Sequence, residues 1–139
     1  MTRARAVDLT LWSGVAVVAV GIVVISVTAD PNIKGMQFAG ADKVAHSIAY
    51  LALTLMLLLA GVWRPGRNGG VWNRPLPALL IVIAYGGVLE LIQGAVGRDA
   101  QFSDLLADAL GALLALAAWA GIRRTWGESE VRARGGIEG

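Results

Sequence analysis

Long apolar runs separated by short polar segments dominate the chain of 139 residues. A helix that crosses a bilayer needs about 20 apolar residues, because it rises about 1.5 Å per residue through roughly 30 Å of hydrocarbon. Four segments meet this requirement. We expect each to be α-helical, since lipid offers no partner to exposed backbone N–H and C=O groups. They cover approximately residues 9–28, 44–63, 76–97 and 105–122.

The polar connectors between these runs have the composition of turns. The segment 64–70 reads RPGRNGG, and Pro75 and Pro77 stand where the start of a helix tolerates proline. No internal repeat and no linker long enough to divide domains is present. The pattern predicts an all-α membrane protein with a single domain over residues 1–124, a bundle of four transmembrane helices. Residues 125–139 are polar and Gly-rich and are predicted to form a disordered tail.

The first apolar run has a second interpretation as a secretory signal. Arg3 and Arg5 precede it, and the small-residue segment 27–29 (VTA) follows it, as at a signal cleavage site. The run is longer than the roughly 7–15 residues of a typical signal core. We therefore expect this helix to be retained.

Composition agrees with a lipid environment. Hydrophobic residues make up 56% of the chain and charged residues only 16%, with a mean hydropathy of +0.63, whereas about a quarter of the residues in a soluble domain are charged. The absence of Cys excludes disulfides, thiolate metal ligands and thiol nucleophiles. Nucleic-acid binding is not expected, because no basic segment is predicted to be ordered outside the membrane.

The distribution of basic residues predicts the orientation. On a four-helix zigzag, one side holds only Lys34, Lys43 and Arg98, and the other side holds all the remaining Lys and Arg residues. Short cytoplasmic loops carry the excess of Lys and Arg. The tryptophans also cluster on the basic side, where an amphipathic ring sits at headgroup level. Both termini are therefore predicted to be cytoplasmic.

Several polar side chains fall inside or beside the predicted spans. An ionisable group in hydrocarbon costs roughly 2.5–3.5 kcal/mol on insertion scales, so such residues usually have a role. Asp42, His46 and Tyr50 are four residues apart and share one helix face. On the predicted topology nearly the whole set lies in the outer half of the membrane, which predicts a polar pocket open to the outside and floored by Tyr50 and Tyr85. The set is Asp42, Lys43, His46, Tyr50, Tyr85, Glu90, Gln93, Arg98, Asp104 and Asp108.

Three members of this pocket are candidate catalytic residues, namely Glu90, His46 and Asp108. A buried carboxyl or imidazole can act as a general acid or base or carry a proton, although it can also simply hold helices together. Lys43 and Arg98 suit an anionic group, or they anchor helix ends at the headgroups. The candidate ligand-binding residues are Lys43, Arg98, Tyr50, Gln93 and Asp104. Asp104 has a structural alternative as the cap of the fourth helix.

No cofactor is predicted. His46 is the only histidine, so a metal site would need carboxylates for its other ligands. Together with Glu90, Asp104 and Asp108 it has the chemistry to bind a divalent cation. No spacing here is diagnostic of a metal site, and no metal ligand is assigned.

The order of these residues resembles the VanZ-like family of small integral membrane proteins. The resemblance covers residues 29–119 and rests on three stretches. These are DKVAHSIAY at 42–50, ELIQ at 90–93, and the segment from Arg98 through Ser103 and Asp104 to Asp108 and Gly111. Asp108 stands where this family often has Asn. The family is named for a protein associated with low-level resistance to teicoplanin, a glycopeptide that acts on the cell wall. The resemblance implies a role in the bacterial cell envelope, in the cytoplasmic membrane, and supplies no reaction.

Three functions of different classes fit this pattern. The first is an enzyme or binding protein for a lipid-linked envelope component, with Lys43 and Arg98 holding an anionic head while Glu90 and His46 move a proton. The second is a proton- or ion-coupled carrier, which the apolar inner halves of the helices disfavour. The third is a non-catalytic partner of a larger membrane complex. Membrane lipids are expected partners in all three cases.

Overall fold

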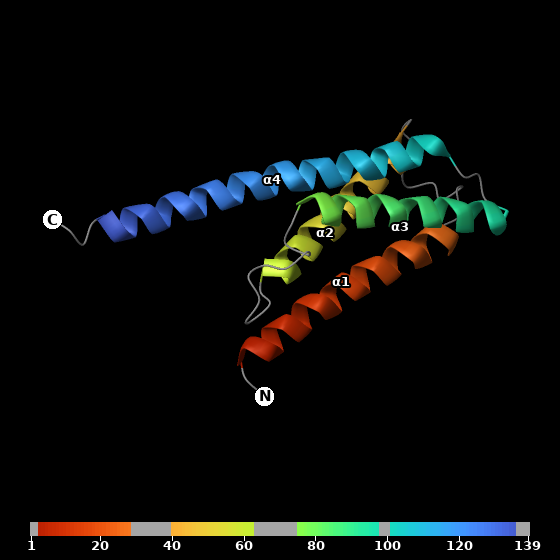
Figure 1. Cartoon of the computed structure of the whole chain (residues 1–139). Coiled ribbons are helices and arrows are strands. Elements are labelled where there is room, and N and C mark those ends of the chain that lie inside the picture. Colours follow the sequence, from red (N-terminus) through yellow and green to blue (C-terminus); the bar gives the residue numbers. More distant parts are fainter. Residues whose placement is uncertain (1–2, 29–39, 63–74, 98–100, 136–139) are drawn as a thin grey trace.

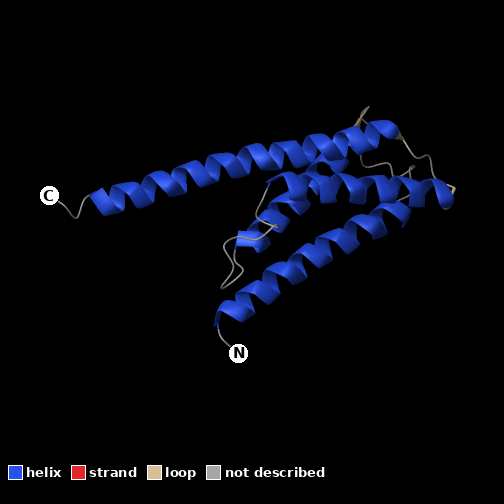
Figure 2. Ribbon diagram, in the orientation of Figure 1, coloured by secondary structure: helices blue, strands red, loops and turns tan. Residues whose placement is uncertain are grey.

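The computed structural model describes residues 3–28, 40–62, 75–97 and 101–135, and every regular element among them is an α-helix (Figure 2). The helices are α1 (Arg3–Thr28), α2 (Ala41–Val62), α3 (Pro75–Ala95) and α4 (Phe102–Gly135) (Figure 1). Each is long and apolar enough to cross a membrane. The prediction of an all-α architecture with four potential membrane spans is therefore confirmed.

Local chemistry sets several helix ends. Pro75 opens α3, because its missing N–H would have no partner in the first turn of a helix. Gly97 follows α3 with a φ of 79°, and Gly40 precedes α2 with a φ of 88°. Glycine adopts this left-handed conformation without the steric cost that a Cβ brings. The ends of α2 and α3 and the start of α4 lie within three residues of the predicted ones.

The two outer helices are longer than their predicted spans. α1 begins at Arg3 instead of Leu9, and α4 continues to Gly135, well into the segment predicted to be a disordered tail. The stretch after residue 125 is rich in Glu and Arg, which are good helix formers. Polarity and glycine alone therefore did not predict where helix α4 ends. Residues 136–139 of the predicted tail lie outside the described part of the chain.

The helices alternate in direction along the bundle (Figure 1). The C-terminal ends of α1 and α3 lie beside the N-terminal ends of α2 and α4, and both chain termini lie toward the opposite end. α2 and α4 make the most extensive contact. The Ser47 hydroxyl donates to the Ala107 carbonyl over 2.8 Å, and a methyl group at Gly111 would overlap the Ser47 backbone. These small residues bring the two helix backbones close together.

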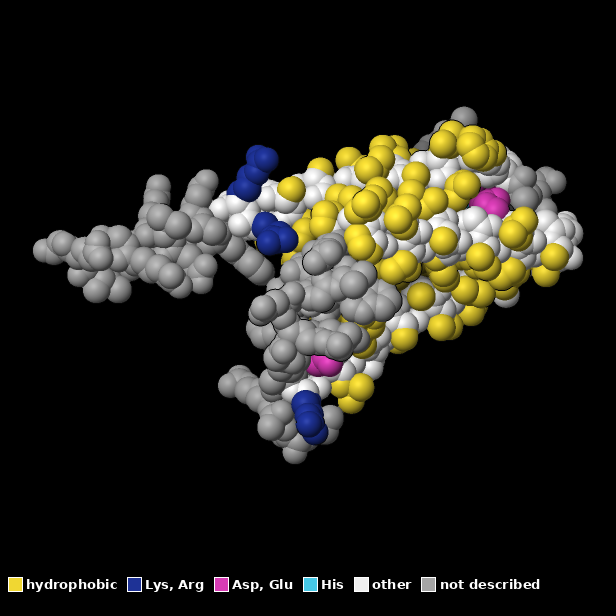
Figure 3. Space-filling model, in the orientation of Figure 1, with side chains coloured by type: hydrophobic (Ala, Val, Ile, Leu, Met, Phe, Trp, Pro, Cys, Tyr) yellow, Lys and Arg dark blue, Asp and Glu magenta, His cyan; other side chains and the backbone are white. Residues whose placement is uncertain are grey.

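Apolar side chains fill the centre of the bundle and also cover its outside (Figure 3). Leu58 and Val82 are fully buried, while Val17 and Leu91 are 71% and 74% exposed. Exposed apolar surface of this extent suits a lipid environment, because in water it would drive aggregation. α1 is the least buried helix, and Ile22 is the only buried side chain among its described residues. The structure is that of a multi-pass membrane protein with a lipid-facing surface.

Candidate functional site

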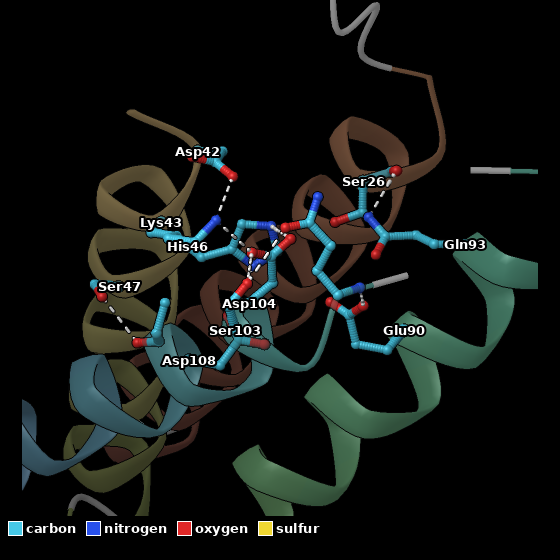
Figure 4. Close-up of polar contacts among 12 residues, drawn as sticks. Ser26, Asp42, Lys43, His46, Ser47, Glu90, Gln93, Ser103, Asp104 and Asp108 are labelled. Atoms are coloured by element: carbon cyan, nitrogen blue, oxygen red, sulfur yellow. Dashed lines mark hydrogen bonds and ion pairs between the residues drawn. The ribbon is translucent and has the colours of Figure 1, made fainter. Parts of the chain in front are cut away.

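A polar cluster lies at the end of the bundle opposite the chain termini (Figure 4). The first two turns of α2, the last turns of α3 and the first two turns of α4 supply its side chains. They meet because the helices alternate in direction, so the start of α2 and of α4 faces the end of α3. We call this set the polar cluster, and its members are Asp42, Lys43, His46, Glu90, Asp104 and Asp108.

The contact between His46 and Asp108 joins α2 to α4 at the centre of the cluster. His46 Nδ1 lies 2.8 Å from Asp108 Oδ1, which is a hydrogen-bond distance. When the carboxylate is ionised it can only accept, and Nδ1 is then the donor of this pair. In a neutral ring, Nε2 then keeps the lone pair, and it lies 4.0 Å from Asp104 Oδ2. This arrangement is that of a histidine oriented by a carboxylate, with its second nitrogen able to accept a proton.

Asp108 is the most buried charged residue of the cluster, with 1% of its surface exposed. Its second oxygen, Oδ2, has no hydrogen-bond partner among the described residues. This oxygen faces α3, where a Cβ built on Gly86 would lie 2.7 Å from it. A buried acceptor without a partner is costly and calls for an explanation. The cluster therefore has acceptor capacity that the described protein groups do not use.

Glu90 connects the end of α3 to the start of α4. Its half-buried carboxylate accepts a hydrogen bond of 2.9 Å from the backbone N–H of Gln101. One side-chain ligand atom each from His46, Glu90 and Asp108 lie within 4.8 Å of one another. The structure thus brings together the three residues that the sequence analysis predicted to be catalytic.

Lys43 is paired within the cluster. Its ammonium nitrogen lies 2.9 Å from Asp42 Oδ2 and 3.4 Å from Asp104 Oδ1. Asp104 is 7% exposed, and its carboxylate faces Lys43 and His46. Asp104 therefore bridges α4 to α2, and it also stands in the first turn of α4, where a negative charge complements the helix dipole. The predicted role of Lys43 in holding an anion would require these two carboxylates to release it or share it.

Two tyrosines lie beneath the cluster as predicted. The Tyr50 ring, 1% exposed, stacks on His46 with ring centroids 6.4 Å apart and an interplanar angle of 12°. Tyr85 lies 6.1 Å from Tyr50 between ring centroids, and its hydroxyl donates to the Ala19 carbonyl on α1 over 2.5 Å. Tyr50 thus forms the floor under His46, and Tyr85 connects that floor to α1.

Two candidate residues are not part of the cluster as described. Gln93 is 6% exposed and donates to the Ser26 carbonyl on α1 over 3.0 Å, so its amide is bonded to α1 (Figure 4). Arg98 lies outside the described residues. Conversely, Ser47 and Gly86 shape the site without having been given a role. The sequence could have pointed to both, because Ser47 directly follows His46 and Gly86 is one helical turn before Glu90.

The charges of the cluster are unequal. Among the described residues, the site holds one ammonium group, one imidazole and four carboxylates, from Asp42, Glu90, Asp104 and Asp108. In a site surrounded by apolar helices, such a surplus of negative charge is only weakly screened and attracts cations. The arrangement can accept, hold and donate protons, and it offers nitrogen and oxygen ligands to a cation.

No protein-family model, no curated protein and no solved structure matches the chain. The geometry of the polar cluster is therefore the basis for any functional assignment.

Proposed function

We propose that this chain is a VanZ-like protein of the bacterial cytoplasmic membrane that binds and processes an anionic, lipid-linked component of the cell envelope. The observation that carries this proposal is the His46–Asp108 pair, 2.8 Å apart, with Glu90 beside it at one end of an apolar bundle. The excess of basic residues at the other end supports cytoplasmic termini and hence an outward-facing cluster. At that depth the cluster would meet lipid headgroups.

The roles follow from the contacts of each side chain. Asp108 holds the imidazole of His46 in one orientation and would balance its charge when Nε2 takes a proton. Glu90 is a second titratable group close to His46. One of these two residues can therefore accept a proton while the other donates one. Positioned general acid–base groups of this kind typically contribute about 10²–10⁴-fold to a rate. The class of step supported is proton transfer at a headgroup that enters from the membrane surface.

The other two functions have less support. A proton carrier needs polar groups along its whole path, but the described core below Tyr50 is mainly apolar, with Leu53, Leu57 and Leu58 beside the buried Thr54. A helix face that docks on a partner subunit often carries small residues, but Ala107 and Gly111 of α4 already pack against α2 within the chain.

An envelope-antibiotic assay tests the proposal. Bacteria that express the wild-type chain, at matched membrane levels, are compared for teicoplanin susceptibility with those expressing His46→Ala or Glu90→Gln. We expect the wild type to reduce susceptibility, and both variants to lose this effect. Matched controls are Ile48→Ala and Leu91→Ala, at neighbouring positions that are 61% and 74% exposed, and these should behave as wild type. Full activity of both cluster variants at normal protein levels would end the proposal.

A further inference from the structure

We infer that the polar cluster binds a divalent transition-metal ion of the Zn²⁺ or Mn²⁺ class, held by His46, Glu90 and Asp108. This inference deepens the proposed function. It rests on that function only for the role that the bound ion would have. Binding itself is argued from the geometry and charge of the cluster.

The three side chains are close enough to share one ion. Their ligand atoms lie within 4.8 Å of one another, and two ligands that each lie about 2.0–2.2 Å from an ion are at most roughly 4.4 Å apart. Side-chain adjustments of a few tenths of an ångström therefore suffice. The residues come from α2, α3 and α4, so no single helix has to bend to complete the set.

The unpartnered oxygen of Asp108 is a separate observation that indicates a ligand. The side chain is 1% exposed, and Oδ2 has no hydrogen-bond partner among the described residues. It points toward Gly86 on α3, one helical turn before Glu90. Buried carboxylate oxygens are normally satisfied by a donor or a cation. A metal ion between α3 and α4 would satisfy this oxygen.

The surroundings of His46 suit a metal ligand. Its two ring nitrogens face carboxylates, Nδ1 at 2.8 Å from Asp108 and Nε2 at 4.0 Å from Asp104. A histidine that binds metal through one nitrogen usually donates the other N–H to a carboxylate or carbonyl, which fixes the ring. Binding of the ion through Nδ1, on the side of Asp108, therefore leaves Nε2 facing Asp104, a carboxylate outside the three ligands.

The balance of charges favours binding of a cation, not of an anion, directly at this site. The four carboxylates of the cluster exceed its basic groups, and the ammonium of Lys43 already lies between Asp42 and Asp104. A divalent ion would relieve the repulsion between Glu90 and Asp108. It would also present positive charge to the anionic headgroup. Lys43 is less able to do so, because its ammonium is paired with Asp42 and Asp104.

The ligand types limit the choice of metal. Ca²⁺ and Mg²⁺ prefer sets made of oxygen ligands, whereas one imidazole with two carboxylates suits Zn²⁺ or Mn²⁺. Three protein ligands leave at least one coordination position open, as in catalytic zinc sites. That position would take water or an oxygen of the headgroup.

Direct binding measurements test the inference. The full chain is purified in detergent without a polyhistidine tag, titrated calorimetrically with ZnCl2 and with MnCl2, and its metal content is measured by mass spectrometry. We expect one ion per chain. Loss of an outer-shell partner weakens metal binding about 10–100-fold, so His46→Ala, Glu90→Gln and Asp108→Asn should weaken it at least that much. Leu91→Ala changes a 74% exposed side chain next to Glu90 and keeps every group of the cluster, so it should leave the affinity within about twofold, well short of such an outer-shell loss.

Glu90→Gln is the decisive variant, because Glu90 is half-buried at the end of the bundle and the change is nearly isosteric. A monodisperse Glu90→Gln protein that binds as tightly as wild type would overturn the inference, as would a wild-type chain that binds neither ion. The result also separates the two proposals. If wild type binds no ion but the cluster variants still lose the envelope effect, only the metal site fails. If metal binds as expected but the variants keep the envelope effect, only the proposed function fails.

Discussion

The two oxygens of the Asp108 carboxylate have different surroundings. Oδ1 accepts from His46, and Oδ2 lies against α3 at Gly86. A Cβ at Gly86 would lie 2.7 Å from Oδ2 and 3.2 Å from Cε1 of Tyr50. Both distances are shorter than ordinary contacts, and Asp108 is too buried to move aside freely. The absence of a side chain at position 86 is therefore part of what holds Asp108 on His46.

Gly86→Ala should destabilise the protein and separate Asp108 from His46. Overpacking of this kind typically costs about 1–3 kcal/mol, and we expect a lower thermal unfolding midpoint in detergent together with a lost envelope effect. Gly87→Ala is the matched control, since nothing lies within 4 Å of a Cβ at that position. Equal effects of the two substitutions would mean that the contact with Asp108 does not matter.

For single residues, the sequence predicted the level of each side chain along its helix better than the side of the helix on which it lies. It placed His46, Glu90 and Asp108 at the same level, and the structure brings them together. It also grouped Gln93 with Glu90, but three residues leave them about 60° apart around the helix. That rotation is enough to point Gln93 at Ser26 on α1. The rotation of one helix against another depends on packing, which spacing alone does not encode.

The crossing of α2 and α4 determines the geometry of the site at the scale of the helices. His46 and Ser47 are neighbours on α2, and their partners Asp108 and Ala107 are neighbours on α4. Gly111, one turn further along α4, would overlap the Ser47 backbone if it carried a methyl group. Backbone atoms cannot rotate away as a side chain can. Any side chain at position 111 must push the helices apart.

Gly111→Ala should therefore be at least as harmful as Gly86→Ala. We expect a loss of about 1–3 kcal/mol or more from overpacking, and weaker metal binding because His46 moves away from Asp108. Gly121→Ala lies on the same helix, where nothing is within 4 Å of an added Cβ, and it should keep the wild-type unfolding midpoint. A stable Gly111→Ala protein with an intact site would contradict the close crossing.

The spans of the helices followed from apolar length, but the closest helix pair did not. Small residues occur on several helices, and a sequence does not tell which partner each small residue meets. Helices α3 and α4 follow one another in the chain and contact each other through Glu90 and Gln101. The more extensive contact, between α2 and α4, joins helices that are not consecutive.

At the scale of the whole molecule, the described arginines and the polar cluster lie at opposite ends of the bundle. Among the described residues, Arg5, Arg123 and Arg124 lie toward the chain termini, and Figure 3 shows exposed basic side chains at that end. The positive-inside rule then predicts cytoplasmic termini and an outward-facing cluster. The fold agrees with either orientation, so this prediction needs its own measurement.

Cysteine labelling measures the orientation directly, because the chain has no native Cys. Asp42→Cys, at a position whose side chain is 51% exposed, should react with a membrane-impermeant maleimide in intact cells. Arg124→Cys, at an exposed position near the other end, should react only after the membrane is disrupted. The reverse pattern would place the cluster on the cytoplasmic side and contradict the envelope proposal.

The separation of His46 and Asp108 along the chain has a consequence for biosynthesis. The two residues are 62 positions apart, on helices with α3 between them in sequence. When membrane helices insert first and associate afterwards, α2 enters the bilayer before its carboxylate partner has been translated. The imidazole must then stay near water or headgroups until α4 arrives. A chain that ends before α4 therefore lacks the carboxylate that pairs with His46.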